Sequence, residues 1–391
     1  MVVATKLPFE QSNPLQIAPR LRELQAQGAV HRVYTEVGDL AWLVMRYADV
    51  RRLLDDDRLG RAHPEPEKAA RTGESALFGG PLGEFATEHA DHQRMRKLLH
   101  PHFAPKHMRA LRSRIETLTT GLLDDLAEHG PPADLHATVA MPLPILVICE
   151  LLGVPYDDRE RFRRWTDDAS NFRDRARSEH GLGELFAYGR QLVAAKRCVP
   201  GDDVISRLCR TEGVTDDEVA QLSMFLLFAG HETTVVQIGL TALLLLADPV
   251  EWDALVAEPD LVANAVEETL RASRKGGLGI PRYARTDLEI GEITVKAGEL
   301  VLLDLSASNH DPAVFADPER VDVTRHAGAQ LSFGYGPRYC IGAPLARIEL
   351  QTVFSQLVSR FPSLRLATDV AELAMRDDEL AGGLTALPVR W

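Results

Sequence analysis

Apolar residues recur every three or four positions along much of this chain, which is the spacing of one face of a helix. The pattern is clearest over residues 108–126, 143–152 and 344–361. Strand signals are shorter and occur at 41–45, 288–293, 300–303 and 386–389. The chain is therefore predicted to be mainly α with a small β portion, to which both ends of the sequence contribute.

The longest predicted helix begins after Thr215 and ends before Pro249. Residues 215–218 match a capping box, and about 32 residues would span roughly 48 Å at ~1.5 Å each. That length and the apolar content of 219–247 would also suit a membrane span. Polar side chains at the centre of the segment would be costly in lipid. We therefore expect a helix that crosses the middle of the molecule.

The composition is that of an ordinary globular protein, with 45% hydrophobic and 26% charged residues. The 44 basic and 57 acidic residues give a net charge of −13, opposite to that expected of a nucleic-acid binder. The first 14 residues hold no apolar run as long as a signal peptide or anchor, so we expect a cytoplasmic protein without a membrane segment.

No linker, low-complexity stretch or repeat divides the sequence, which predicts a single domain over residues 1–391. Its helix-rich body should cover about 90–275 and 340–361. Its β-rich part should come from about 30–60, 280–335 and 362–391.

Four cysteines share no paired spacing, so neither a zinc site nor a disulfide framework is predicted. Cys149, Cys198 and Cys209 have the sequence context of structural thiols. Cys340 instead lies in Phe333-Gly334-Tyr335-Gly336-Pro337-Arg338-Tyr339-Cys340-Ile341-Gly342, just before a helix that should begin at Pro344. Glycines allow close approach of the backbone to a flat ligand, and a helix start favours a thiolate.

Three interpretations of this thiol are open from the residues alone. A nucleophile needs a nearby base, and the loop offers only Arg338. An inert buried thiol is the usual state of a lone cysteine. A ligand to a metal or to haem iron is the third.

The spacing Phe333-x-x-Gly336-x-x-x-Cys340-x-Gly342 resembles the haem-binding loop of the cytochrome P-450 family, the haem-thiolate monooxygenases, in its soluble bacterial type. The resemblance implies a triangular helical body with a long central helix and short β-sheets. It also implies haem b as cofactor, O₂ as co-substrate, Cys340 as the proximal iron ligand and Phe333 as a shield of the sulfur. Gly342 would belong to the same cofactor-binding loop.

A second motif is Glu268-Thr269-Leu270-Arg271, in which the i,i+3 spacing puts a carboxylate and a guanidinium on one helix face. Alone it would suit a solvated surface pair. The resemblance implies instead a buried structural pair, Glu268 and Arg271, that braces the proximal side of the haem.

A third motif is Ala229-Gly230-His231-Glu232-Thr233-Thr234, in the long helix. In a structural interpretation the glycine allows close packing and Thr233 bonds back to a carbonyl, with a local kink. The resemblance assigns Glu232 and Thr233 to an acid–alcohol pair that delivers protons during oxygen activation.

Haem propionates need cations when they are partly buried. The resemblance implies four donors to them: His92, Arg96, Arg282 and Arg338. Bacterial relatives more often carry histidine at the last of these places. The segments 309–312 and 315–320, each a turn when taken alone, extend the resemblance, which covers about residues 13–391.

The resemblance implies a monomeric monooxygenase that hydroxylates or epoxidises a small hydrophobic molecule, such as a natural-product intermediate. Electrons would come from NAD(P)H through a ferredoxin reductase and a ferredoxin. Oxidative coupling or ring formation, a peroxide-driven enzyme, and a haem-thiolate protein that binds a ligand without turnover are the alternatives. The ferredoxin could dock on a basic rim, or that rim could be a solvated face; its residues are Arg94, Arg96, Lys97, Arg109, Arg112 and Arg347.

The substrate pocket should be lined by segments that vary within the family: 63–85, 165–188, 225–229, 275–281 and 381–385. Candidate pocket residues in or beside them are Phe78, Phe225, Ala229, Leu278 and Leu384. Glycine pairs at 79–80, 276–277 and 382–383 suggest mobile lids around apolar walls.

Overall fold

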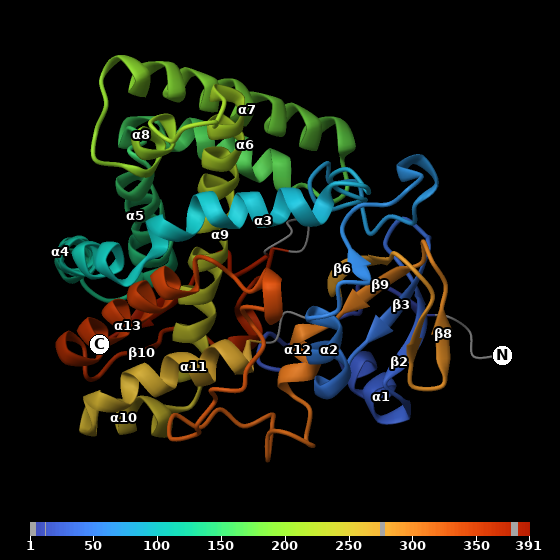
Figure 1. The fold of residues 1–391 in the computed structure, drawn as a ribbon. Helices are drawn as coiled ribbons and strands as arrows, with labels where there is room; N and C mark the ends of the chain where they lie inside the picture. Colours follow the sequence, from blue (N-terminus) through green and yellow to red (C-terminus); the bar gives the residue numbers. More distant parts are fainter. Residues whose placement is uncertain (1–4, 12, 274–277, 377–381) are drawn as a thin grey trace. The chain divides into compact units, whose positions relative to one another are not determined.

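The computed structural model describes residues 5–11, 13–273, 278–376 and 382–391, and it is mainly helical with small sheets, as predicted (Figure 1). The helices are α1 Pro19–Gln27, α2 Tyr47–Leu54, α3 Glu88–Leu99, α4 Pro105–His129, α5 Pro142–Leu152, α6 Arg159–Ser170, α7 Arg175–Cys198, α8 Val204–Cys209, α9 Asp216–Ala247, α10 Pro249–Ala257, α11 Val262–Ala272, α12 Leu305–Asn309 and α13 Ala343–Arg360. The strands are β1 Thr5–Lys6, β2 Val30–Tyr34, β3 Leu40–Val44, β4 Leu59–Gly60, β5 Ala133–Asp134, β6 Ile280–Ala284, β7 Leu288–Ile290, β8 Ile293–Val295, β9 Leu300–Leu303, β10 Arg365–Leu366 and β11 Pro388–Arg390.

The chain divides into two compact units. The first unit consists of Met1–His92 and Glu267–Cys340, and the second of Gln93–Val266 and Ile341–Trp391. The segments 30–60 and 280–335, predicted to be rich in strands, belong to the first unit, and 362–391 belongs to the second. The single-domain interpretation stays a prediction.

The first unit is built on a six-stranded sheet in the order β1-β2-β3-β9-β6-β4. At its centre two strands far apart in the sequence lie side by side. β3 pairs with β9 in parallel, with Trp42 opposite Val301 (Figure 1, blue beside orange). All four residues of β9 are buried, as expected of an apolar strand covered on both faces. The predicted strands at 41–45 and 300–303 are confirmed as β3 and β9.

The predicted strand at 288–293 is wrong in detail, because it is a hairpin of β7 and β8. Gly291 has a φ of 61°, in the left-handed region that a tight two-residue turn requires. The sequence patterns also missed β2 and β6. β6 contains Pro281 and a charged residue, and its pairing with β9 outweighs its weak strand propensity.

The second unit is organised around α9. The Thr215 hydroxyl accepts from the backbone N–H of Glu218 at 3.2 Å, as the capping-box pattern predicted. Pro249 is the first residue of α10, so α9 ends where expected. Among the described residues α9 is the one helix long and apolar enough to cross a membrane, but 78% of its apolar window is buried within the protein. This burial is that of a core helix.

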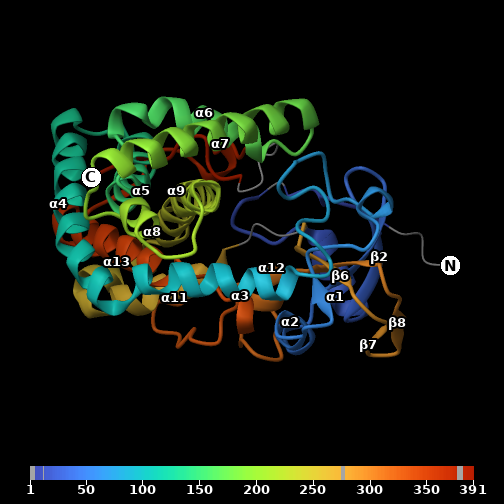
Figure 2. The same ribbon diagram turned by 45° about the horizontal axis from the view of Figure 1, so that its top comes forward.

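Glycines let neighbouring helices approach α9 closely. A Cβ on Gly230 would lie 2.6 Å from Ile148 Cδ1 on α5, and one on Gly189 of α7 would lie 2.7 Å from Met224 Cγ on α9. α6 runs along α7 (Figure 2), and α4 along α13. A small sheet, β10-β11-β5, completes this unit. Its strand β11 confirms the C-terminal strand signal, shifted by one or two residues.

Candidate functional site

The cysteine loop of the first unit is shaped by glycine. The backbone N–H of Cys340 donates to the Phe333 carbonyl at 2.9 Å and closes the loop. Gly336 has a φ of 70°, which glycine adopts without strain. A Cβ there would lie 3.0 Å from Asp55 Cα and closer still to the Asp55 carboxylate. Position 336 therefore requires glycine both for its backbone angle and for the close approach of Asp55.

Cys340 is exposed, whereas Cys149 and Cys209 are buried, and the four cysteines form no disulfide within the described part of the chain. Burial raises the pKa of the Cys149 thiol to about 12, which suits an inert structural thiol. Cys198 is exposed, because the last turn of α7 faces solvent, so its interpretation as a structural thiol is wrong. The Phe333 ring meets Tyr339 edge-on, with ring centroids 6.3 Å apart.

Two arginines of the first unit share one carboxylate, that of Glu88 at the start of α3. Arg338 Nη2 pairs with Glu88 Oε1, and Arg285 Nη1 lies 3.2 Å from Oε2. The backbone N–H groups of Arg61 and Ala62 also donate to the Glu88 carboxylate, at 2.6 and 3.1 Å. Burial would raise the pKa of Glu88, but these donors and cations outweigh it and lower the pKa.

Two further guanidiniums lie near this carboxylate, that of buried Arg282 and that of partly buried Arg61. Burial, together with the nearby charges of Arg338 and Arg61, lowers the pKa of Arg282 to about 9. Burial also lowers the pKa of Arg61, whose Nε is buried without a hydrogen-bond partner among the residues that the structure describes. Four arginines therefore face one glutamate, and this concentration of positive charge suits a ligand that carries carboxylates.

The pair Glu268–Arg271 is fully buried, with both side chains 0% exposed. Arg271 Nε and Nη2 donate to the two carboxylate oxygens at 2.8 and 2.7 Å. The remaining Arg271 donors reach the carbonyls of Asn309, Pro318 and Arg320 at 2.9 to 3.2 Å. The buried pair implied by the resemblance therefore forms, and it ties α11 to the segment 309–320.

Sequence reasoning missed a third member of this network. Arg325 Nε donates to Glu268 Oε1 at 3.1 Å, and its Nη1 donates to the Ala316 carbonyl at 2.6 Å. Arg325 lies 57 positions after Glu268, so helix spacing could not have found it. Its one signal is the turn at Asp322 just before it, whose backbone N–H also donates to Glu268.

On α9 the third motif divides into a buried part and an open part. Glu232 is buried, while Thr233 is exposed and its hydroxyl donates to the Ala229 carbonyl at 2.9 Å. This confirms that Thr233 bonds back to a carbonyl. Thr234 is buried and donates to the Gly230 carbonyl at 3.4 Å. Burial lowers the pKa of the neighbouring His231 to about 4.

One stripe of α9 is more open than the rest of this buried helix. Phe225 is 42% exposed, and one and two turns further along the same face lie Ala229, partly exposed, and Thr233, exposed. Helix geometry thus aligns two of the predicted pocket residues with the predicted proton-delivering alcohol.

The other predicted pocket residues are distributed between the units. Phe78 and Leu278 belong to the first unit and are partly buried. Leu384 belongs to the second unit and is buried, with Cδ1 3.7 Å from where a Cβ on Gly239 would be. The glycine pair 276–277, the start of 275–281 and Ala381 lie outside the described residues.

His92 and Arg96 lie one turn apart on α3, and both are partly buried. Arg94, which the sequence analysis placed on the basic rim, forms an ion pair with Glu218. Its Nε and Nη2 donate to the Glu218 carboxylate at 2.7 and 2.9 Å, which raises the pKa of Arg94 and lowers that of Glu218. This ion pair offsets the charge that Arg94 would bring to a docking surface.

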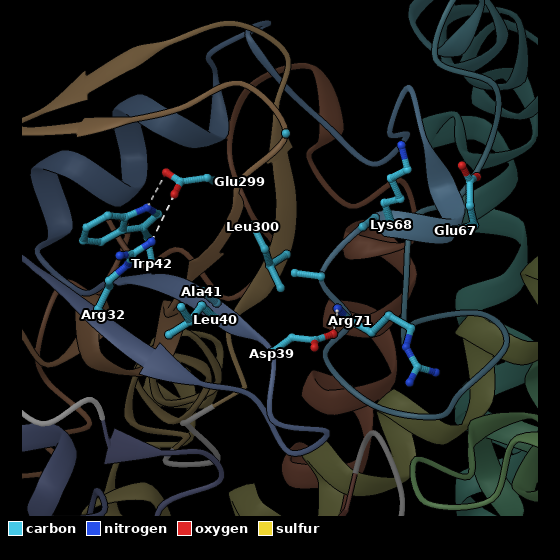
Figure 3. A pocket seen from close by; sticks show the side chains of 13 residues that line it. Arg32, Asp39, Leu40, Ala41, Trp42, Glu67, Lys68, Arg71, Glu299 and Leu300 are labelled. Atoms are coloured by element: carbon cyan, nitrogen blue, oxygen red, sulfur yellow. Dashed lines mark hydrogen bonds and ion pairs between the residues drawn. The ribbon is translucent and has the colours of Figure 1, made fainter.

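A cavity of about 500 Å³ lies elsewhere in the first unit, between β2, β3 and residues 67–71 (Figure 3). In its lining, Trp42 Nε1 and Arg32 Nη2 donate to Glu299 at 2.8 and 3.2 Å. None of the predicted pocket residues or residues 331–342 lines it. This cavity is therefore distinct from the cysteine loop.

The side chains of the first unit fit haem b. Cys340 offers an exposed sulfur in a loop held by glycine, and the buried cations beside Glu88 exceed the carboxylate charge that faces them. A group with a thiolate-bound iron and two carboxylates matches both features.

Comparisons with known proteins agree with this geometry. The family model "Cytochrome P450" matches residues 200–376. The chain is 40% identical to pentalenolactone synthase of Streptomyces exfoliatus, over 98% of each chain. It is 37% identical to mycinamicin IV hydroxylase/epoxidase of Micromonospora griseorubida, also over 98% of each. The solved structure of the pimaricin epoxidase PimD superposes with a TM-score of 0.89 at 38% identity, and all of both chains is covered.

The chain belongs to the cytochrome P450 family. It is a cytochrome P450 monooxygenase, and membership implies haem b and the use of O₂. The resemblance seen in the cysteine loop and the predicted fold class are thereby confirmed.

Proposed function

We propose that this monooxygenase inserts one oxygen atom of O₂ into a small hydrophobic natural-product intermediate, by hydroxylation or epoxidation. The observation that supports this proposal is the partly exposed face of α9 on which Phe225, Ala229 and Thr233 lie. Two apolar side chains next to a hydroxyl suit an apolar substrate held beside a proton donor. Relatives that act in natural-product pathways, such as the mycinamicin enzyme and PimD, support this class of substrate.

Haem bound through Cys340 would supply the oxygen-activating chemistry. His92, Arg96, Arg282 and Arg338 would hold its propionates, with Phe333 and Gly342 beside the sulfur. Thr233 donates to the Ala229 carbonyl, so its hydroxyl must turn away from that carbonyl to give a proton to a ligand. Buried Glu232, the preceding residue, would return a proton to Thr233.

The thiolate is tested with Cys340→Ser. We expect the reduced, CO-bound wild-type protein to show the spectrum of a thiolate-ligated haem and the variant to lose it. Cys198→Ser is the matched control, because Cys198 is also an exposed cysteine, and it should keep the spectrum. A normal thiolate spectrum in Cys340→Ser would overturn the assignment.

The proton-delivery role is tested by comparing Thr233→Ala with Thr234→Ala. Both hydroxyls bond to a carbonyl one turn earlier, but Thr233 is exposed and Thr234 is buried. We expect Thr233→Ala to release more hydrogen peroxide per NAD(P)H consumed, with less product, and Thr234→Ala to stay coupled. Equal coupling in the two variants would remove Thr233 from the role.

The substrate class is tested by titrating the ferric protein with macrolide, terpenoid, aromatic and cyclic-peptide compounds. A saturable low-spin to high-spin change in the haem absorption identifies a compound that enters the site. The product mass then separates the reactions, because hydroxylation and epoxidation add an oxygen whereas oxidative coupling removes hydrogens. A product that has lost hydrogens would show that the reaction is oxidative coupling, the alternative within this family, and not oxygen insertion.

Electrons would reach the site from NAD(P)H through a ferredoxin reductase and a ferredoxin, with the protein acting as a cytoplasmic monomer of one domain. The ferredoxin would dock on the basic rim defined above. Because Arg94 is paired with Glu218, the rim would rely on residues such as Arg109 and Arg112. Reversing the charge of these two arginines should raise the Michaelis constant for ferredoxin. An unchanged Michaelis constant would show that the ferredoxin docks on another surface.

A further inference from the structure

We propose that Glu88 is a positioning residue for the haem site: it holds Arg338, and with it the positive charge that the cysteine loop presents. This inference rests on the proposed function, in which Cys340 holds haem. Sequence analysis did not select Glu88, which lies one helical turn before His92 on α3.

The Glu88 carboxylate joins four separate segments of the first unit. It pairs with Arg338, two residues before the cysteine, and with Arg285, just after β6. It accepts from the backbone at Arg61 and Ala62, directly after β4. Arg285 also donates to the Phe85 carbonyl at 2.7 Å, with its guanidinium 4.0 Å from the Phe85 ring centroid. The carboxylate is thus fixed from several directions.

The backbone at Gly60 packs closely against the Glu88 carboxylate. A Cβ on Gly60 would lie 3.2 Å from Glu88 Cδ and closer still to Oε2. A larger residue at position 60 would therefore push the carboxylate away from its partners. Gly60 has an ordinary backbone angle, so its close contact with Glu88 is the constraint at this position.

The pair with Glu88 engages Nη2 of Arg338 and leaves other N–H donors of the guanidinium for a second acceptor. A guanidinium carries five N–H donors, so this second acceptor can be a propionate. A histidine at this position would carry at most one positive charge and fewer donors than arginine. The Arg338–Glu88 pair gives this chain a cation whose direction is set before the ligand arrives.

A charge beside a redox centre changes its reduction potential, because reduction adds an electron. Loss of the Glu88 charge leaves more positive charge near the site, so the reduced state is favoured. Loss of the Arg338 charge does the opposite. If Glu88 also positions Arg338, the effect of removing Arg338 must depend on whether Glu88 is present.

The test is a spectroelectrochemical titration of the haem-loaded protein and of four variants. We expect Glu88→Gln to have a more positive reduction potential than the wild type, and Arg338→Gln a more negative one. In the Glu88→Gln background, Arg338→Gln should shift the potential clearly less than in the wild type. Glu299→Gln is the matched control, because Glu299 also pairs with an arginine of the first unit but is not in contact with the cysteine loop, and its potential should not change.

Gly60→Ala keeps the Glu88 charge but displaces the carboxylate from its partners. It is therefore the second test variant if Glu88→Gln does not fold. Its potential should shift because Arg338 is released, and the Arg338→Gln effect should shrink in this background too. An unchanged potential in Glu88→Gln, or an Arg338→Gln effect of equal size in all backgrounds, overturns the inference. A wild-type protein without the thiolate-type CO spectrum would instead contradict the proposed function, so the two failures are distinguishable.

Discussion

Two sets of buried ionisable groups, one in each compact unit, differ in what surrounds them. In the first unit Glu268 and Arg271 are fully buried and meet at 2.7 Å, with Arg325 as a second cation. In the second unit Glu349 on α13 and His231 on α9 are also buried, but neither has an oppositely charged side chain as partner in the part of the chain that the structure describes. Burial raises the pKa of Glu349 well above its ordinary value and lowers that of His231, so it favours the neutral form of both.

The difference follows from what the groups connect. Arg271 donates to the carbonyl of Asn309, the last residue of α12, and to those of Pro318 and Arg320 in the loop that follows, so its charge organises backbone. Glu349 and His231 lie inside regular helices whose backbone is already satisfied. The charges of Glu268 and Arg271 thus organise loops of the cysteine-bearing unit, whereas burial among helices favours the neutral forms of Glu349 and His231.

The largest effect expected from this comparison is that of Glu268→Ala. It leaves the fully buried Arg271 and the nearby Arg325 without their carboxylate. We expect a loss of about 3–5 kcal/mol in the free energy of unfolding, measured by urea denaturation. Glu319→Ala breaks a pair with Arg22 that is half exposed and should cost at most about 1 kcal/mol. Equal losses would show that Glu268 does not organise the loops.

The next effect is the acid sensitivity that His231 gives to the second unit. Its pKa is about 4 when folded and 6.5 when free, so between these values only the unfolded chain binds the proton. The contribution of neutral His231 to stability is complete above pH 6.5 and decreases as the pH falls to 4. The total is about 3 kcal/mol.

His231→Asn keeps a donor for the Leu227 carbonyl, to which His231 bonds at 2.9 Å, but cannot gain a charge. We expect its free energy of unfolding to fall less steeply than that of the wild type between pH 6.5 and 4. Parallel pH curves would show that another group is responsible for the acid loss.

A smaller effect, of opposite sign, is expected at Glu349. Its Oε2 is buried and has no hydrogen-bond partner in the described part of the chain. Its raised pKa means that the unfolded chain releases this proton at a lower pH than the folded protein. The wild type therefore loses stability as the pH rises towards neutrality. Glu349→Leu should stabilise the protein by about 1–3 kcal/mol near neutral pH and less at acid pH. A destabilised leucine variant would reveal a partner for Glu349.

The smallest effect is that of Thr215→Ala, which removes the cap of α9. Thr215 is exposed and accepts one backbone hydrogen bond at 3.2 Å. We expect a loss of about 1 kcal/mol in thermal or urea denaturation, without dependence on pH between 4 and 8. This variant calibrates an ordinary exposed contact against the buried groups above.

Local spacing explains which parts of this structure could be predicted. The limits of α9, the i,i+3 contact of Glu268 with Arg271 and the stripe through Phe225, Ala229 and Thr233 all follow from helix geometry. Arg325 and Glu88 could not be found in this way, because they meet their partners 57 and 250 positions away. Such contacts depend on the folded loops and on the sheet.

The strand errors have the same origin. β6 carries Pro281 and Arg282 and becomes a strand because β9 and β4 lie on either side of it. Arg282 is then buried by this pairing, opposite Val301, which no periodicity within the segment would indicate. The hairpin at Gly291 shows the reverse case, where a local turn residue divided a segment that apolar content alone would make continuous.

The pairing of β3 with β9 also sets an order of events during synthesis on the ribosome. Leu43 meets Leu302, and at ~5–20 residues per second the ribosome needs roughly 13–50 s to make the chain between them. In that time the whole stretch 93–266 emerges, and its helices can fold through local contacts. The N-terminal strands wait with an unpaired edge, which a chaperone could shield. Cys340 is made later still, so capture of the cofactor belongs to the last stage of biogenesis.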